Sequence, residues 1–162
     1  MNKIILIGIP GAGKSTLGRR LADELNLPFF DTDELVVLKG KLKTYADFIR
    51  MALNGQFIAI QKEIIAELSR SKGKAVISTG AEVALIPKCA SLMKKMGKII
   101  HLKRDPEIIL VKGAVRQSEG IRLYMQDYHQ YEALADLILD NNGSEDEGLK
   151  KLLGVLDECR SW

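Results

Sequence analysis

This chain of 162 residues has only two cysteines, and neither sign of charge is in large excess. The two cysteines, Cys89 and Cys159, form no CxxC pair and lack any metal-ligand spacing, which argues against a disulfide framework or a cysteine metal site. Two unconnected thiols fit a reducing compartment, so we expect a cytoplasmic protein. No apolar run approaches the length of a membrane span, and Met1 leads into an expected strand rather than a signal peptide.

The charge balance gives no sign of a nucleic-acid or membrane partner. The chain has 24 basic and 21 acidic residues mixed along its length, for a net charge of +3. Neither an internal repeat nor a low-complexity linker is present. At 46% hydrophobic residues the chain can bury a core unaided, so we expect a single domain over 1–162 and a monomer.

What the chain does have is concentrated near its start. An apolar run from Lys3 is followed by a turn in which Gly8, Gly13, Lys14 and Ser15 satisfy the G-x-x-x-x-G-K-[ST] pattern. In such a loop the backbone N–H groups surround an anion, and the next helix directs the positive end of its dipole at the same place. Lys14 would reach the β- and γ-phosphates, and the Ser15 hydroxyl would bind Mg²⁺. The sequence therefore predicts a nucleoside triphosphate site, in preference to a plain turn between a strand and a helix.

Strand-like and helix-like segments alternate along the rest of the chain. We expect strands at 3–8, 28–30, 75–78, 98–102 and 135–139. We expect helices after the phosphate loop, from Thr44, over 57–69 and 88–96, from Asp105, and after Ser144. Gly97 is expected to end its helix as a left-handed cap. Because the strands are continuously apolar, the pattern indicates an α/β fold with a parallel sheet covered on both faces.

Two carboxylates, Asp31 and Asp33, follow the second expected strand. If the extended conformation continues through them, both side chains project the same way. One could then hold Mg²⁺ through water while the other accepts the proton of an attacking hydroxyl. The alternative is that one of them caps the following helix. Thr79 and Gly80 end the third strand, so all these groups should meet at the carboxyl edge of the sheet, where such sheets bind ligands.

The segments 8–16 (GIPGAGKST), 30–33 (FDTD), 78–80 (STG) and 131–136 (YEALAD) together resemble the shikimate kinase family, and the similarity runs nearly from end to end. The resemblance implies a three-layer P-loop kinase fold, with a five-stranded parallel sheet in the order 2-3-1-4-5 and helices on both faces. It also implies ATP and Mg²⁺ as co-substrates, and transfer of the γ-phosphate to a hydroxyl of a small-molecule acceptor.

The resemblance assigns roles to individual residues. The nucleotide would contact Gly8, Gly11, Ala12, Gly13, Lys14, Ser15 and Thr16. Ser15 and Asp31 would hold the metal ion, while Lys14 and Asp33 would be catalytic, with Asp33 on the acceptor side. The acceptor would bind against helices at about 34–70. A short lid at about 116–127, which we expect to be mobile, would bring Arg116 or Arg122 to the transferring phosphate.

The acceptor side departs from the family pattern. The family has a Phe-Arg-x-x-Glu motif, in which the arginine holds the shikimate carboxylate and the glutamate braces the arginine. In this chain Ile58 stands in place of the arginine and Gln61 in place of the glutamate. Gly80, Ala81 and Glu82 replace a glycine triplet that lines the acceptor. Counted back from Tyr131 without gaps, Asp127 occupies the place of a second carboxylate-binding arginine.

Losing two arginines would cost on the order of 4 kcal/mol, about a thousandfold in affinity. We therefore expect the ATP half to be retained and the acceptor to be a neutral or amine-bearing hydroxyl compound, unless Arg50 or Lys39 takes over or a gap near Gly120 moves Arg122 into place. The alternatives are shikimate itself, a nucleoside monophosphate, and a nucleotide-binding regulatory protein without catalysis. The intact Asp33 argues against the last of these.

Four aromatic or imidazole side chains late in the chain invite a functional interpretation. Tyr124, Tyr128 and Tyr131 lie at helical spacing, and we expect one packed helix face rather than a surface that stacks on adenine. His101 falls in the fourth expected strand, where we expect a buried or edge residue whose hydrogen bonds are satisfied.

Overall fold

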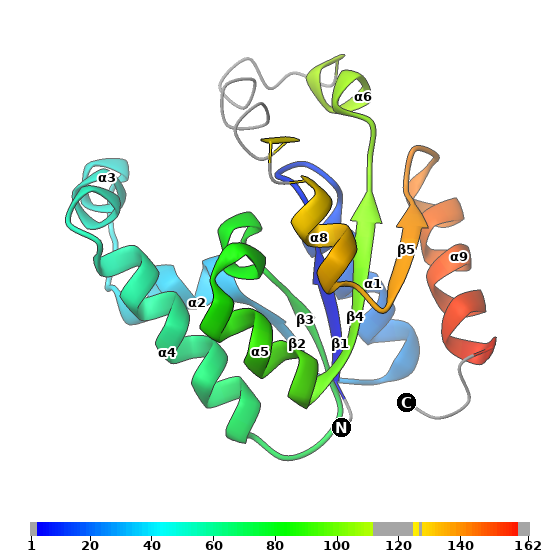
Figure 1. Ribbon diagram of the computed structural model, residues 1–162, viewed down its shortest axis with the longest axis horizontal. Helices are drawn as coiled ribbons and strands as arrows, with labels where there is room; N and C mark the ends of the chain where they lie inside the picture. Colours follow the sequence, from blue (N-terminus) through cyan, green and yellow to red (C-terminus); the bar gives the residue numbers. More distant parts are fainter. Residues whose placement is uncertain (1–2, 112–124, 127, 159–162) are drawn as a thin grey trace.

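A five-stranded parallel sheet forms the centre of the molecule (Figure 1). The computed structural model describes residues 3–111, 125–126 and 128–158. The strands are β1 (Lys3–Ile7), β2 (Phe29–Asp31), β3 (Ala75–Ser78), β4 (Gly97–Lys103) and β5 (Leu137–Asp140). They are arranged in the order β2-β3-β1-β4-β5, and every neighbouring pair is parallel. The predicted fold class and strand order are therefore confirmed.

Helices cover the two faces of this sheet (Figure 1). They are α1 (Lys14–Leu25), α2 (Thr32–Lys39), α3 (Tyr45–Leu53), α4 (Gln56–Arg70), the 3-10 helix η1 (Ala81–Leu85), α5 (Pro87–Met96), α6 (Pro106–Val111), α8 (Tyr128–Leu134) and α9 (Glu145–Glu158). Helix α1 packs beside α9 on one face, and α4 and α5 pack together on the other, which α8 shares. None of the helices in the described ranges is long and apolar enough to cross a membrane.

Burial explains why these segments are strands and helices. All five residues of β1 are buried, as expected for a central strand that is covered on both faces. Leu17 and Leu21 of α1 are buried against the sheet. Thr44 and Asp47 exchange hydrogen bonds at the start of α3, and Ser144 and Glu147 do so at the start of α9, so both predicted helix starts are confirmed.

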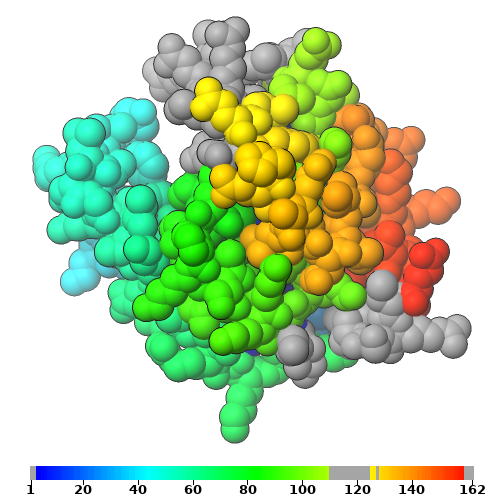
Figure 2. Space-filling model, in the orientation of Figure 1, coloured from blue at the N-terminus to red at the C-terminus, as the bar shows by residue number. Residues whose placement is uncertain are grey.

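Helices α2, α3 and α4 lie along one edge of the molecule, and α3 projects beyond the sheet (Figures 1 and 2). Large apolar side chains are exposed on them: Val37, Leu38, Tyr45, Ile49, Leu53 and Ile58. Helix α4 anchors this group, since it contacts α2, α3 and α5. Its inner face carries the buried Gln61, Ile64 and Ile65 toward the core.

At the Asp pair the structure has the helix cap that was the alternative, and the expectation for Gly97 is wrong. The extended conformation does not continue through Asp33, because the Asp31 side chain accepts hydrogen bonds from the backbone N–H groups of Asp33 and Glu34 and starts α2. Gly97 is not a left-handed cap either, since it has φ −179° and begins β4. A side chain at that position would collide with the backbone of Lys3 on the neighbouring strand, which explains the glycine.

Candidate active site

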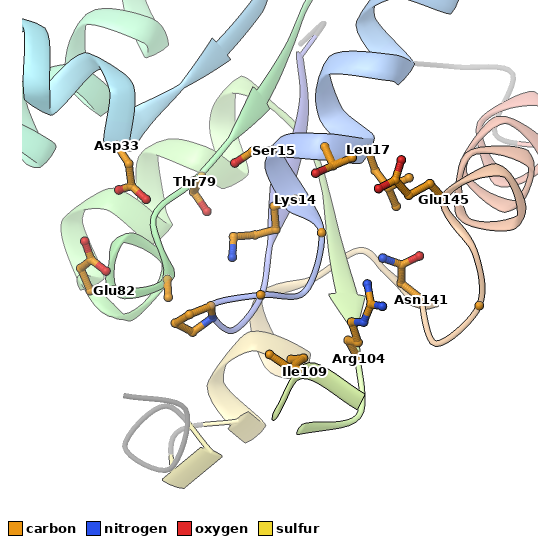
Figure 3. Close-up of a pocket in the computed structure, with 16 residues that line it drawn as sticks. Lys14, Ser15, Leu17, Asp33, Thr79, Glu82, Arg104, Ile109, Asn141 and Glu145 are labelled. Carbon is orange, nitrogen blue, oxygen red and sulfur yellow. The ribbon is translucent and has the colours of Figure 1, made fainter. Parts of the chain in front are cut away.

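The loop between β1 and α1 borders a cavity of about 720 Å³ at the carboxyl edge of the sheet (Figure 3). The walls come from α2, the β3–η1 connection, the ends of β4 and β5, and the start of α9. Parallel sheets of this kind bind ligands at this edge. The predicted site residues can therefore be compared with the lining of this open cavity.

Close backbone contacts require the glycines of the loop. Gly8 has φ 147°, and a Cβ atom there would lie 2.7 Å from the carbonyl oxygen of Leu102. Gly13 has φ 93°, and a Cβ atom there would lie 2.8 Å from Nδ2 of Asn141. Because Asn141 also donates a hydrogen bond to the Ala12 carbonyl at 2.8 Å, the loop is fastened to the end of β5.

Lys14 lies curled within the loop. Its Nζ donates hydrogen bonds to the carbonyls of Gly8 at 2.9 Å and Ile9 at 2.8 Å. Burial lowers the pKa of Lys14 to about 8, although Asp33 and Glu82 act in the opposite direction. The side chain therefore remains largely charged near neutral pH and presents an ammonium group where a phosphate chain would lie.

The side chains of Ser15 and Asp31 form a hydrogen-bonded pair, and each could supply an oxygen ligand to a metal ion. The Ser15 hydroxyl donates to Oδ2 of Asp31 at 2.5 Å and lies 3.2 Å from the hydroxyl of Ser78. The described residues contain no cluster of three or more metal-ligating side chains. A hydroxyl and one carboxylate fit Mg²⁺, which binds few protein ligands and shares the rest of its shell with phosphates and water.

The end of the cavity at which we expect the acceptor is acidic. Asp33 and Glu82 line one side of it, across from Arg104 and Asn141 (Figure 3). Burial raises the pKa of Asp33 to about 6, and the neighbouring Glu82 adds to this effect. Ala81 lines the same wall.

Several predicted acceptor residues lie elsewhere. Ile58 is 44% exposed on α4 and is not among the described residues that line the cavity. The two basic residues considered as replacements for the missing arginines are engaged away from it, because Lys39 pairs with Glu63 and Glu67, and Arg50 with Asp47. Arg116, Arg122, Asp127 and most of the expected lid lie outside the described residues.

The opposite end of the cavity is formed by residues that the sequence did not predict. Arg104, Ile109 and Asn141 line it, just beyond the ends of β4 and β5. The Nε atom of Arg104 is buried and has no hydrogen-bond partner within the described ranges. The signal for these residues in the sequence was their position after a strand, because polar side chains that follow parallel strands tend to reach the edge of the sheet where ligands bind.

His101 is buried, as expected, but its hydrogen bonds are not satisfied. Neither ring nitrogen has a partner in the part of the chain that the structure describes. The ring stacks on Tyr131 at 5.5 Å and lies in a T-shaped arrangement with Tyr128 at 5.1 Å, so these two tyrosines pack as expected, whereas Tyr124, the third residue of the predicted face, lies outside the described residues. Burial lowers the pKa of His101 to about 4. Because Tyr131 donates to the Ala81 carbonyl at 2.8 Å, this cluster also supports the cavity wall at Ala81.

A glycine loop that surrounds a lysine ammonium at the end of the central strand, in a sheet of this order, defines a nucleotide-binding protein of the P-loop kinase class. A family model described as shikimate kinase matches residues 10–157. The chain belongs to the shikimate kinase family. It is therefore a small-molecule kinase, and the family implies ATP as the phosphate donor.

Individual relatives agree over almost the whole chain. The shikimate kinase of Enterococcus faecalis is 31% identical, covering 98% of this chain and 100% of the relative. That of Moorella thermoacetica is also 31% identical, covering 98% and 95%. Among solved structures, shikimate kinase from Aquifex aeolicus has a TM-score of 0.82 at 26% identity, covering 98% of each chain. The Acinetobacter baumannii enzyme in complex with shikimate has a TM-score of 0.84 at 23% identity, covering 98% and 94%, which bears on the fold alone.

Proposed function

We propose that this protein transfers the γ-phosphate of ATP, with Mg²⁺ bound, to a hydroxyl group of a small polyhydroxy acceptor. The observation that carries the proposal is that Lys14 and Asp33 line the same cavity from opposite elements, with Ser15 between the two halves. A phosphate donor and an acceptor hydroxyl could therefore meet in this one cavity.

The donor half binds and neutralises the phosphates. The loop N–H groups and Lys14 would hold the β- and γ-phosphates, with Thr16 at the α-phosphate, and the Ser15 hydroxyl and Asp31 carboxylate would hold the metal. When bound, Mg²⁺ neutralises charge on the transferring phosphate. Arg116 and Arg122 are our candidates for an additional cation.

The acceptor half orients the nucleophile. Asp33, whose pKa is about 6, is mostly ionised near neutral pH and can accept the proton of a hydroxyl directed at the γ-phosphate. Gly80 brings the β3–η1 backbone against this carboxylate, and its N–H donates to the Thr32 hydroxyl at 2.8 Å. The reaction requires little beyond this positioning and charge neutralisation.

Shikimate is the first acceptor to test, because the curated relatives are named shikimate kinases and one solved relative is in complex with shikimate. The acidic wall formed by Asp33 and Glu82 favours a second candidate, an alcohol without a carboxylate. The expectations of a monomer and of a cytoplasmic location stay predictions.

The deciding experiment is a coupled assay of ADP release with shikimate and with neutral and amine-bearing polyols, in the wild type and in Asp33→Asn. We expect acceptor-dependent turnover in the wild type and a loss of at least about a hundredfold in the variant. Calorimetry should show unchanged ADP affinity, because Asp33 lies on the acceptor side. The proposal fails if no acceptor stimulates ADP release, or if Asp33→Asn turns over as fast as the wild type.

A further inference from the structure

Three side chains from different elements converge on Gly80. A Cβ atom at this glycine would lie 2.5 Å from Oδ1 of Asp33, 3.0 Å from Oε1 of Glu82 and 3.1 Å from Nε2 of Gln61. Helices α2, η1 and α4 each contribute one of these groups. The absence of a side chain at Gly80 therefore allows a compact polar cluster to form at the acceptor end of the cavity.

Gln61 holds Glu82 in place within this cluster. The Gln61 side chain is fully buried, and its Nε2 donates a hydrogen bond to Oε1 of Glu82. Its own Oε1 atom is buried without a partner in the described part of the chain. This hydrogen bond from a buried amide restricts the position of the Glu82 carboxylate.

The wall that results carries negative charge toward the acceptor. Asp33 and Glu82 both line the cavity, and Asp31 lies close enough to influence Asp33. The cations among the described lining residues are Lys14 and Arg104. Lys14 lies inside the phosphate loop, where the donor's phosphates would engage it, and Arg104 lies across the cavity from this wall (Figure 3).

Such a wall discriminates by the charge of the acceptor. A carboxylate placed against Asp33 and Glu82 would be repelled by both, whereas an ammonium group would be attracted by both. Hydroxyl groups can donate hydrogen bonds to either carboxylate without a change in net charge. Donor-rich and cationic compounds therefore fit this end of the cavity better than anionic ones do.

We infer that Glu82, positioned by Gln61, is the specificity-determining residue of the acceptor site, and that it selects an amine-bearing polyhydroxy compound over the corresponding carboxylate. The inference rests on the proposed function in one respect, which is that the acceptor binds against the wall formed by Asp33 and Glu82. Glu82 contacts the acceptor, and Gln61 is a positioning residue.

The test uses three compounds that share one ring and carry an anionic, a neutral or a cationic substituent. They are shikimate, its neutral methyl ester, and the analogue in which an aminomethyl group replaces the carboxylate. Each is titrated by calorimetry into the full chain loaded with Mg²⁺ and ADP. We expect the aminomethyl compound to bind tightest and shikimate weakest, with an affinity ratio of at least about tenfold.

Variants connect this ratio to the two residues. Glu82→Gln removes the charge and should reduce the ratio by about tenfold. Gln61→Met keeps the length of the side chain but removes the donor, and should reduce the ratio by a smaller factor with ADP affinity unchanged. The matched control is Glu24→Gln, which removes one negative charge from the exposed face of α1 and should leave the ratio as it is.

Three results would overturn the inference: shikimate binding as tightly as its ester, the same affinity ratio in Glu82→Gln as in the wild type, or no binding of any of the three compounds while ADP still binds. The wild-type order tests the preference for charge, and this part of the test does not depend on the folding of a variant. Turnover of the tightest compound with ATP is measured separately. Binding in the expected order without a phosphorylated product would refute the proposed function and leave the recognition intact.

Discussion

Acidification should destabilise this protein through a single buried side chain, His101. The residue is fully buried in β4 and lies against the rings of Tyr128 and Tyr131. Burial is the main cause that lowers its pKa from 6.5 to about 4. As pH falls below 6.5, the unfolded chain binds a proton at this histidine while the folded protein does not. Stability that is complete above pH 6.5 is therefore lost progressively as pH falls toward 4.

The magnitude follows from the two pKa values. At about pH 5 the unfolded histidine is almost fully protonated and the folded one mostly neutral, which corresponds to a loss of about 2 kcal/mol relative to about pH 7.5. Solvent screening would reduce this to about 1 kcal/mol. Replacing His101 with phenylalanine removes the titrating group and keeps a flat ring against Tyr131. Any packing cost of the larger ring is the same at both pH values and cancels in the comparison.

The assay is urea denaturation of the wild type and His101→Phe at about pH 7.5 and about pH 5, followed by circular dichroism. We expect the wild type to lose about 1–2 kcal/mol more of its unfolding free energy than the variant does between these conditions. Equal m-values in the two proteins would establish that the same unfolding transition is compared. Equal losses in the two proteins would refute the reasoning, because the histidine would then titrate alike in the folded and unfolded states.

Three further changes test the site itself. Lys14→Ala removes the ammonium group from the phosphate loop and should lower turnover at least about a hundredfold in steady-state kinetics, so full residual activity would contradict the nucleotide assignment. Gly80 has a φ of −58°, which any residue can adopt, but the Cβ atom of Gly80→Ala would displace Asp33. We therefore expect kcat/KM for the acceptor to fall at least about tenfold while the ADP affinity is unchanged. An equal loss of both would argue for a general distortion. Because burial and Glu82 raise the pKa of Asp33 to about 6, kcat/KM should fall as pH drops through about 6. Glu82→Gln should move this fall in kcat/KM to lower pH. An unchanged pH profile would contradict the effect of Glu82 on the pKa of Asp33.

The sequence predicted the donor half well because its signals are local. The apolar run of β1, the glycines and Lys14 all lie within 12 residues, and each has one physical reason to be there. The strand positions followed from short, continuously apolar segments, and the strand order followed from the family resemblance. These features depend little on distant parts of the chain.

The sequence left two conformations open at the Asp pair, although a local signal favoured one of them. Asp31 is followed three residues later by Glu34, which is the spacing of a helix start. The structure uses Asp31 in two ways, since one carboxylate oxygen caps α2 and the other accepts from Ser15. The two interpretations weighed for this pair, a metal-side carboxylate and a helix cap, are therefore compatible in one side chain.

Other features depend on contacts between distant segments and leave no local pattern. Asn141 contacts the phosphate loop across 129 positions of sequence. Gly97 is required by the backbone of Lys3 on a neighbouring strand rather than by the end of its own helix. Gln61 and Glu82 are 21 positions apart and meet only because α4 and η1 both pack against Gly80. Such pairings follow from the packed sheet and its helices.

The two halves of the site also differ in how freely they can change. Ser15 of α1 and Asp31 of β2 are hydrogen-bonded to each other, and Asp31 also caps the start of α2. Substitution of either residue therefore disturbs both this hydrogen bond and the partner that depends on it. Glu82 lines the cavity and accepts a hydrogen bond from Gln61 of α4. A paired change there can alter which acceptor binds while nucleotide binding and the sheet stay intact. Membership of the family therefore constrains the phosphate chemistry of this chain more tightly than it constrains the molecule that receives the phosphate.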